Sequence, residues 1–220
     1  MPLHAQAWQE ALRPLGLRIS KRMIYEWEGE SGIVTAATVL SRAGTPPSRR
    51  AVAALLDAKE RRFQRLARRV RVHPRLAALL ADLSARKLPL ALVTGTSARE
   101  VRRVVPSAIR AHFAVLVTGD QVRRGKPHPE PYRTALRKLQ VPPHRAVVVE
   151  NAPYGIRSAR GAKAGRVVAL ASSLPPRFLR EADVIVSSVP QLCACLKRLV
   201  MPRLTSRRLR PYNTRNRRRS

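Results

Sequence analysis

The sequence predicts an α/β protein with a doubly wound parallel sheet and an α-helical cap. From residue 73 onward, short apolar runs alternate with amphipathic stretches, as strands and helices do in a parallel sheet. Before residue 73, apolar residues recur at helical spacing and no strand is expected. The 220 residues are enough for one α/β domain with a small insert, or for two small domains. We therefore expect a helical cap over residues 1–72 and an α/β core over residues 73–200.

The cap is predicted to contain four helical stretches. The first runs from Pro2 to Leu15 and is stopped by Gly16. Two more lie between residues 20 and 43, with a break at residues 29–32. Ser48 is placed to cap the fourth, which extends to about Val70 and carries Lys59 on its apolar side. This piece is expected to sit over the C-terminal edge of the sheet.

The core is predicted to contain five strands within the sequence, separated by helices. The first apolar run, 88–93, is expected to be buried on both faces. The expected strands are 88–93, 113–117, 146–149, 167–170 and 184–186, and the expected helices are 75–87, a stretch ending near 105, 131–140, 155–164 and 191–199. Ligands of such sheets bind beyond the carboxyl ends of the strands, so polar residues there are the candidates for function.

The charge of the chain suggests a polyanionic partner. Its formal net charge is +31, and residues 201–220 hold eight arginines and no acid, so this tail is expected to be disordered. However, only seven of the 44 basic residues are lysines, and such an arginine bias also arises from a GC-rich genome. Aromatic residues make up only 4%, so stacking platforms for single strands are scarce. Nonspecific nucleic-acid binding is therefore kept as an alternative function.

No stretch of the chain predicts membrane association. No apolar run approaches the roughly 20 residues of a membrane span, and residues 1–12 lack the pattern of a signal peptide. Cys193 and Cys195 are too few ligands for a zinc site and are interpreted as packing residues in a reducing compartment. We expect a cytoplasmic protein.

Three strand ends carry polar residues that suit phosphate chemistry. Thr94, Gly95 and Thr96 follow the first strand, where a hydroxyl and backbone N–H groups can receive a phosphoryl oxygen. Ser97 and Glu100 fit a capping box that would hold the start of the next helix in place. Lys126 lies on a proline-rich loop and could neutralise a transferring phosphoryl group. The segment that begins at Thr94 can also be interpreted as an ordinary strand-to-helix turn. Lys126 can also be interpreted as a solvated loop lysine.

Glu150 and Asn151 end the strand 146–149. A carboxylate there is costly to bury unless it is paired or bound to a metal, and oxygen ligands of this kind suit Mg²⁺. The alternative is a helix N-terminal acid that interacts favourably with the helix dipole.

In their order and spacing, these segments resemble the haloacid dehalogenase superfamily, most closely its β-phosphoglucomutase-like group with a helical cap. Leu92–Thr94 is similar to the second motif of that family, and Lys126 in Gly-Lys-Pro-x-Pro to the third. Residues 149–155 with Ala159 are similar to the fourth, and residues 1–8 to the segment directly after the first. The resemblance covers about residues 1–200.

The resemblance implies an Mg²⁺-dependent phosphatase or phosphomutase of a small phosphorylated metabolite. Thr94 and Lys126 would act in catalysis, both would bind the substrate together with Gly95 and Thr96, and Glu150 and Asn151 would hold the metal. The family's nucleophile is the first of two aspartates in a D-x-D motif, which the sequence lacks; its four aspartates are Asp57, Asp82, Asp120 and Asp183. Asn151 stands where the family usually has a second acid.

The missing motif also implies a missing strand. In this fold the first strand lies between the strands that end at Thr94 and Glu150, so its absence leaves two strand edges facing a gap. We expect that Met1 is not the biological start and that the chain is inactive as it stands. The alternative is a pseudoenzyme that binds phosphate or nucleic acid. Substrate identity, the choice between phosphatase and mutase, and oligomeric state stay open.

Overall fold

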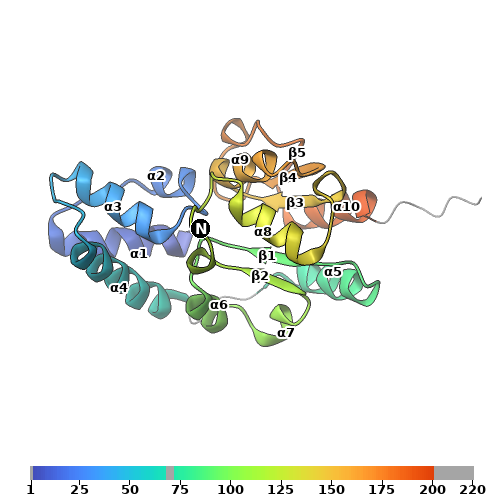
Figure 1. Cartoon of the computed structure of the whole chain (residues 1–220), viewed down its shortest axis with the longest axis horizontal. Coiled ribbons are helices and arrows are strands. Elements are labelled where there is room, and N and C mark those ends of the chain that lie inside the picture. Colours follow the sequence, from blue (N-terminus) through green and yellow to red (C-terminus); the bar gives the residue numbers. More distant parts are fainter. Residues whose placement is uncertain (1, 68–71, 201–220) are drawn as a thin grey trace, which may run out of the picture.

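The protein is divided into a group of helices at one end and a helix-covered sheet region at the other. The computed structural model describes residues 2–67 and 72–200. Helices α1 to α4 form the first group, and β1 to β5 with the remaining helices form the second (Figure 1). This arrangement confirms the predicted α/β class. The tail predicted to be disordered, residues 201–220, lies outside the described residues. No helix in the described ranges is long and apolar enough to span a bilayer.

The helical group is built from four helices that share one apolar core. They are α1 (Pro2–Leu12, continued by the 3₁₀ turn Arg13–Leu15), α2 (Lys21–Glu26), α3 (Gly32–Arg42) and α4 (Arg49–Leu66). Gly16 ends the first helix with a φ of 68°, a left-handed conformation that favours glycine. Ser48 caps α4 as predicted, accepting a hydrogen bond from Ala51 N at 3.2 Å. Trp8, Leu12 and Leu40 are among the residues that close the core.

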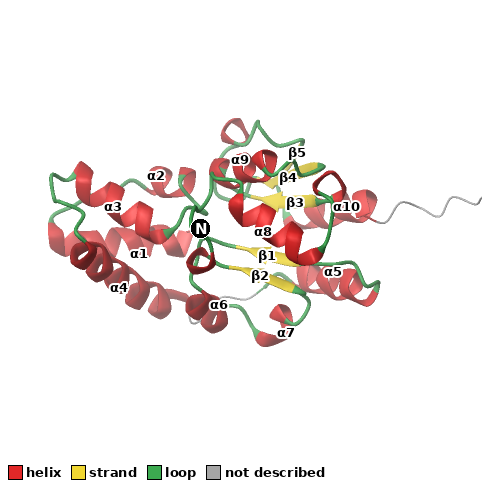
Figure 2. Cartoon of the chain, in the orientation of Figure 1, coloured by secondary structure: helices red, strands yellow, loops and turns green. Residues whose placement is uncertain are grey.

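The α/β region has helices on both faces of its strands (Figure 2). Its strands are β1 (Ala91–Val93), β2 (Val115–Val117), β3 (Val147–Glu150), β4 (Arg166–Leu170) and β5 (Val184–Val186). Its helices are α5 (Pro74–Ala85), α6 (Ala98–Val104), α7 (Ser107–Arg110), α8 (Glu130–Leu139), α9 (Pro153–Gly161) and α10 (Val189–Val200), with 3₁₀ turns at Gly119–Gln121, Pro143–Arg145 and Pro176–Phe178.

The side chains of β4 pack alternately on the two faces of the sheet, which shows why helices cover both faces. Val167 and Ala169 pack in the cluster formed with α8 and α9, whereas Val168 packs in the cluster formed with α5 and α10. Successive side chains of a strand point to opposite faces, so an uninterrupted apolar strand needs helices on both sides. The doubly wound architecture predicted from the sequence is confirmed by this packing.

The strands form two separate parallel sheets. β1 pairs with β2, and β4 pairs with both β3 and β5, but β1 and β3 make no ladder with each other in the described structure. The gap expected between the strands ending at Thr94 and Glu150 is therefore present. In the described residues, β1 and β3 each have one edge without a ladder partner, and these two edges face the gap.

The gap also explains an error in the sequence prediction. The run 88–93 was expected to be a strand buried on both faces, but β1 covers only Ala91–Val93 and all three residues are only half-buried. Val149 of β3 is 41% exposed. Both strands have a ladder partner on one side alone, so their apolar side chains lack a neighbouring strand to cover them.

Candidate active site

The predicted site residues lie at the carboxyl ends of β1 and β3 and on the loop before α8. Lys126 connects these strand ends. Its ammonium donates a hydrogen bond to Val93 O at 3.2 Å, at the end of β1, and another to Glu150 Oε1 at 2.5 Å, at the end of β3. One side chain thus spans the gap between the two sheets. These contacts bring the end of β1, the Lys126 loop and the end of β3 to the same edge of the fold.

Lys126 and Glu150 form a buried ion pair. Their exposed fractions are 4% and 8%, which rules out the plainer interpretation of Lys126 as a solvated loop lysine. The Tyr132 hydroxyl donates to Glu150 Oε1, and the Lys126 ammonium lies 5.0 Å from the centre of the Tyr132 ring. Burial and the negative charge of Glu150 hold the pKa of Tyr132 well above its ordinary value. Tyr132 therefore stays a donor to the carboxylate.

Glu150 has one oxygen with spare acceptor capacity. In the described part of the chain, its Oε2 accepts a hydrogen bond from Asn151 N at 3.2 Å, while Oε1 is shared by Lys126 and Tyr132. A Cβ on Gly155 would collide with this carboxylate, so glycine at the start of α9 makes room for it. Asn151 follows directly, at the turn into α9.

The turn after β1 is ordered by its own hydroxyl groups. Thr94 Oγ1 accepts from Thr96 N at 3.1 Å, and Ser97 Oγ accepts from Glu100 N at 3.2 Å. Ser97 therefore caps α6 as predicted. Glu100 was expected to complete a capping box, but its carboxylate accepts from Lys59 of α4 instead.

Fewer N–H groups are open in this turn than the sequence suggested. The backbone N–H of Thr96 is used by Thr94, and that of Ala98 donates to Asp120 at 3.1 Å. Burial alone would raise the pKa of Asp120, but hydrogen bonds from Thr118 and Ala98 outweigh it and lower that pKa. The Thr94 hydroxyl accepts this hydrogen bond with its oxygen and keeps its own proton to donate.

Loop 28–31 of the helical group covers this site. A Cβ on Gly95 would lie 2.5 Å from Glu30 O, and a Cβ on Gly29 would lie 2.7 Å from Lys126 Cδ. Glycine at both positions allows the loop to approach the core residues closely. The helical group therefore reaches the strand ends, where the sequence analysis expected a cap.

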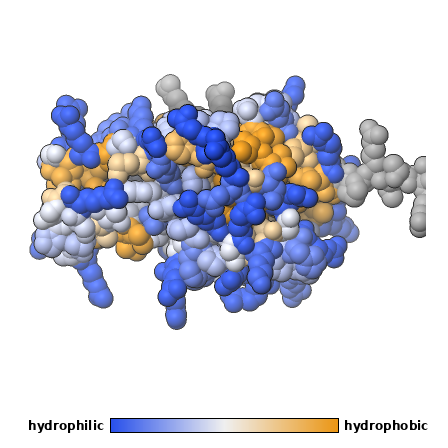
Figure 3. All heavy atoms as spheres, turned by 90° about the horizontal axis from the view of Figure 1, so that it is seen from above, coloured by the Kyte–Doolittle hydropathy of each residue, from blue (hydrophilic) through white to orange (hydrophobic). Residues whose placement is uncertain are grey.

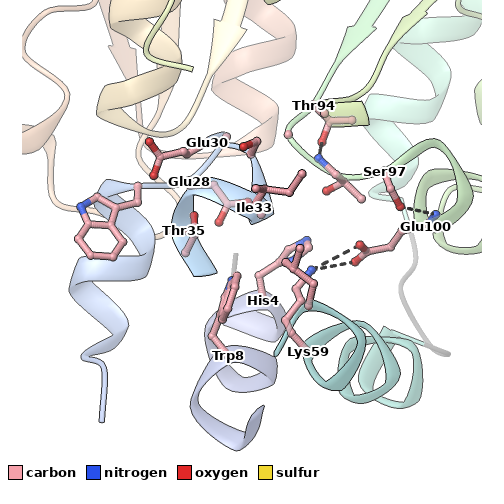
Figure 4. Close-up of a pocket in the computed structure, with 18 of the residues that line it drawn as sticks. His4, Trp8, Glu28, Glu30, Ile33, Thr35, Lys59, Thr94, Ser97 and Glu100 are labelled. Atoms are coloured by element: carbon pink, nitrogen blue, oxygen red, sulfur yellow. Dashed lines mark hydrogen bonds and ion pairs between the residues drawn. The ribbon is translucent and has the colours of Figure 1, made fainter. Parts of the chain in front are cut away.

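A cavity of about 260 Å³ lies between the helical group and the strand ends (Figure 4). Thr94, Gly95 and Thr96 line it from the core, and His4, Trp8 and Thr35 are among the residues that line it from the helices. In Figure 4, Lys59 and Glu100 point toward each other across this boundary. Their atoms lie 3.2 Å apart, and the two residues are 8% and 4% exposed.

Sequence reasoning missed several residues around the site. Glu28, Glu30 and the Lys59–Glu100 pair were not identified, nor was the contact of Tyr132 with Glu150. Lys59 could have been identified from the sequence, because a lysine among the apolar positions of a helix needs a buried partner. Its partner is 41 residues away in the chain, and local spacing does not reveal it.

Comparisons with known proteins agree with the geometry. Residues 1–163 match the model of the haloacid dehalogenase-like hydrolases. The chain is 33% identical over 171 residues to "Protein CbbY" of Cereibacter sphaeroides, covering 73% of this chain and 74% of that protein. It is 32% identical to a "Phosphorylated carbohydrates phosphatase" of Thermotoga maritima, covering 61% and 62%. A putative β-phosphoglucomutase from Bacteroides vulgatus superposes with a TM-score of 0.75 at 26% identity, covering 91% and 83%.

Proposed function

The chain belongs to the haloacid dehalogenase-like hydrolases, and from this we propose that its site serves phosphoryl transfer from a small phosphorylated sugar or polyol, as a phosphatase or phosphomutase. The observation that carries the proposal is the bridge made by Lys126, which brings a buried cation against the ends of both β1 and β3. A fixed ammonium at the strand ends, close to the turn that Thr94 begins, can neutralise charge on a transferring phosphoryl group.

We assign a role to each core residue at this edge. Lys126 stabilises negative charge on the transferring phosphoryl group, and the Thr94 hydroxyl donates to one of its oxygens. Gly95 and Thr96 complete the phosphate-binding turn. Tyr132, a residue the sequence analysis did not single out, positions the Glu150 carboxylate through its hydroxyl. Residues 1–72 would act as the cap that selects the substrate.

Glu150 and Asn151 are proposed to hold Mg²⁺. The space that Gly155 leaves for the carboxylate, and the spare capacity of Glu150 Oε2, fit an oxygen-ligated cation. The described residues contain no group of three or more His, Cys, Asp or Glu side chains able to bind a metal. Mg²⁺ accepts one or two protein ligands and completes its shell with water and substrate phosphate, so this donor set fits a weakly held ion. When bound, the ion would neutralise charge on the phosphoryl group.

The nucleophile is the part that the described residues do not supply. Asp120 is the one aspartate among them that lines the cavity, and its carboxylate is held by Thr118 and Ala98. We propose that catalysis needs an apolar strand between β1 and β3 that ends in the aspartates of the missing motif. Residues 1–220 alone would then be inactive.

A phosphate-release assay tests this proposal. A panel of sugar and polyol phosphates is offered with Mg²⁺ to residues 1–220 and to the same chain preceded by its upstream coding residues. We expect turnover only in the longer protein, and loss of that turnover in EDTA. Turnover by residues 1–220 would contradict the role given to the missing aspartates. In-frame stop codons directly before Met1 would favour the pseudoenzyme alternative.

That alternative rests on the same missing nucleophile and on the net charge of +31. A pseudoenzyme would bind phosphate or nucleic acid without turnover. Its binding of duplex DNA would weaken steeply with salt, because each phosphate contact contributes a slope of about −0.9 to the logarithmic salt dependence.

A further inference from the structure

Backbone groups of β1 point into the gap between the two sheets (Figure 2). At the end of β1, Thr94 N donates a hydrogen bond to Val117 O of β2 at 2.9 Å. Successive residues of a paired strand turn their N–H and C=O groups to opposite edges, so Ala91 and Val93 face away from β2. The hydrogen bond that Val93 O accepts from Lys126 Nζ agrees with this direction. Ala91 and Val93 therefore present their backbone groups to the gap.

The facing edge of β3 presents the same kind of groups. Ala146 O accepts a hydrogen bond from Arg166 N at the start of β4, at 3.1 Å, so Val148 also faces β4. Val147 and Val149 then face the gap. Within residues 2–67 and 72–200, no strand pairs with either of these edges. The gap is thus bordered on both sides by backbone donors and acceptors that a strand between them would engage.

Two helical layers cover both sheets and continue across the gap. Val93 and Val148 belong to the apolar cluster formed with α8 and α9 on one face. Leu90 and Val147 belong to the cluster formed with α5 and α10 on the other face. A segment placed between β1 and β3 would therefore meet apolar side chains above and below. An extended segment that fits there is apolar on both of its faces, as a central strand of a parallel sheet is.

Lys126 gives the gap a charged carboxyl end. The ammonium has three protons, of which one is donated to Val93 O and one to Glu150 Oε1. A strand paired with β1 would supply a backbone N–H to Val93 O in place of Lys126. The ammonium would then have a donor for an acidic side chain at the end of that strand. The net charge of +31 also favours an acidic segment over a basic one.

We propose that the edges of β1 and β3 bind a separate, extended apolar peptide as a strand parallel to both, with a carboxylate at its carboxyl end beside Lys126. About five residues fill such a strand. Hydrogen bonds along both edges supply affinity, and the two apolar layers select the side chains. The inference goes beyond the proposed phosphoryl transfer, because the partner is a second molecule and its binding requires neither substrate nor metal.

Three matched peptides test the proposal. The first has five valine and leucine residues followed by two aspartates, with blocked ends and a fluorescent label. The second has proline at the third position, and the third has the reversed sequence, so all three carry the same charge. Fluorescence anisotropy follows their titration with residues 1–220 near neutral pH.

We expect both control peptides to bind at least about tenfold more weakly than the first. Proline removes a ladder donor, and reversal moves the carboxylates away from Lys126 in a parallel strand. General attraction to the basic surface is the same for all three peptides. A control peptide that binds as tightly as the first would therefore overturn the inference.

Amide exchange followed by NMR locates the bound peptide. The amides of Val93, Val147 and Val149, which face the gap, should exchange at least about tenfold more slowly when the first peptide is bound. Leu92 and Val148 already face β2 and β4, so their amides should gain less protection. Equal gains in the two sets would indicate general stabilisation without a new ladder, and the inference fails.

A second copy of the chain is the competing occupant, because open strand edges also pair with each other. Sedimentation of residues 1–220 distinguishes the two cases. If the first peptide does not bind and the chain is a dimer, a second copy fills the gap. If the peptide does not bind to a monomer, the gap is closed in solution. Both results overturn the inference and leave the proposed function to be judged by phosphate release.

Discussion

Lys126 has partners of two kinds, a carboxylate and a backbone carbonyl, and both come from strand ends that face the gap. Such a buried pair adds little net stability over an apolar pair, but removing one member leaves the other charged and buried. The same reasoning holds for Lys59 and Glu100, which join α4 to α6. Individual charges at the site therefore connect parts of the fold that share few other contacts.

A double-mutant cycle should detect this coupling. Lys126→Met is expected to lower the free energy of unfolding by about 3 kcal/mol at pH 7.5, since it leaves Glu150 buried without its counter-ion. The double variant Lys126→Met/Glu150→Gln should lose less than the sum of the two single variants. Urea unfolding followed by circular dichroism measures all four proteins. Additive losses would show that the two side chains are not coupled.

Glu30 should make stability depend on pH. Burial raises its pKa from 4.5 to about 6 in the folded protein, so the folded state favours the protonated acid. The stability that the protonated form contributes is present below about pH 4.5 and is lost as the pH rises through 6. Glu30→Gln should therefore stabilise the fold by about 1 kcal/mol at pH 7.5, allowing for partial exposure, and have no effect at pH 4. Equal effects at both pH values in thermal unfolding would contradict this.

At the scale of elements, strand length and pairing follow from which edges have a neighbour. The alternation of apolar runs and amphipathic stretches predicted every strand, and Ser48 and Ser97 predicted two helix starts. The length of β1 was overestimated because an apolar sequence does not reveal that one of its edges is open. The pairs Lys59–Glu100 and Tyr132–Glu150 were not predicted because they join residues far apart in the chain.

Hydrogen exchange should report the gap directly. Amides of β4, which has a ladder partner on each side, are expected to exchange most slowly of all the strands. Those of β1 and β3 should exchange faster, because each pairs on one side only. Adding the proposed strand before Met1 should slow exchange in β1 and β3 and leave β5 unchanged. Exchange of β1 as slow as that of β4 in residues 1–220 would show that the gap is closed in solution.

At the scale of the whole molecule, the hydrophilic side chains are spread widely, whereas the candidate site lies at the strand ends. Hydrophilic side chains project along the full length of the face in Figure 3 and do not gather in one stripe. The net charge of +31 gives the protein a positive field, which draws anions toward it without selecting among them. At the site itself, the buried pairs Lys126–Glu150 and Lys59–Glu100 fix the position of individual charges.

A comparison of turnover numbers tests the proposal that Lys126 is the cation of a phosphoryl-transfer site. The chain with the proposed strand and its aspartates added before Met1 is assayed on its best sugar phosphate, beside the same protein carrying Lys126→Ala or a control, Lys138→Ala, which removes an exposed lysine of α8. We predict that Lys126→Ala lowers kcat by about 100-fold or more, the order seen when one electrostatic stabiliser is lost. Lys138→Ala should leave kcat unchanged. Full turnover in folded Lys126→Ala would contradict the account.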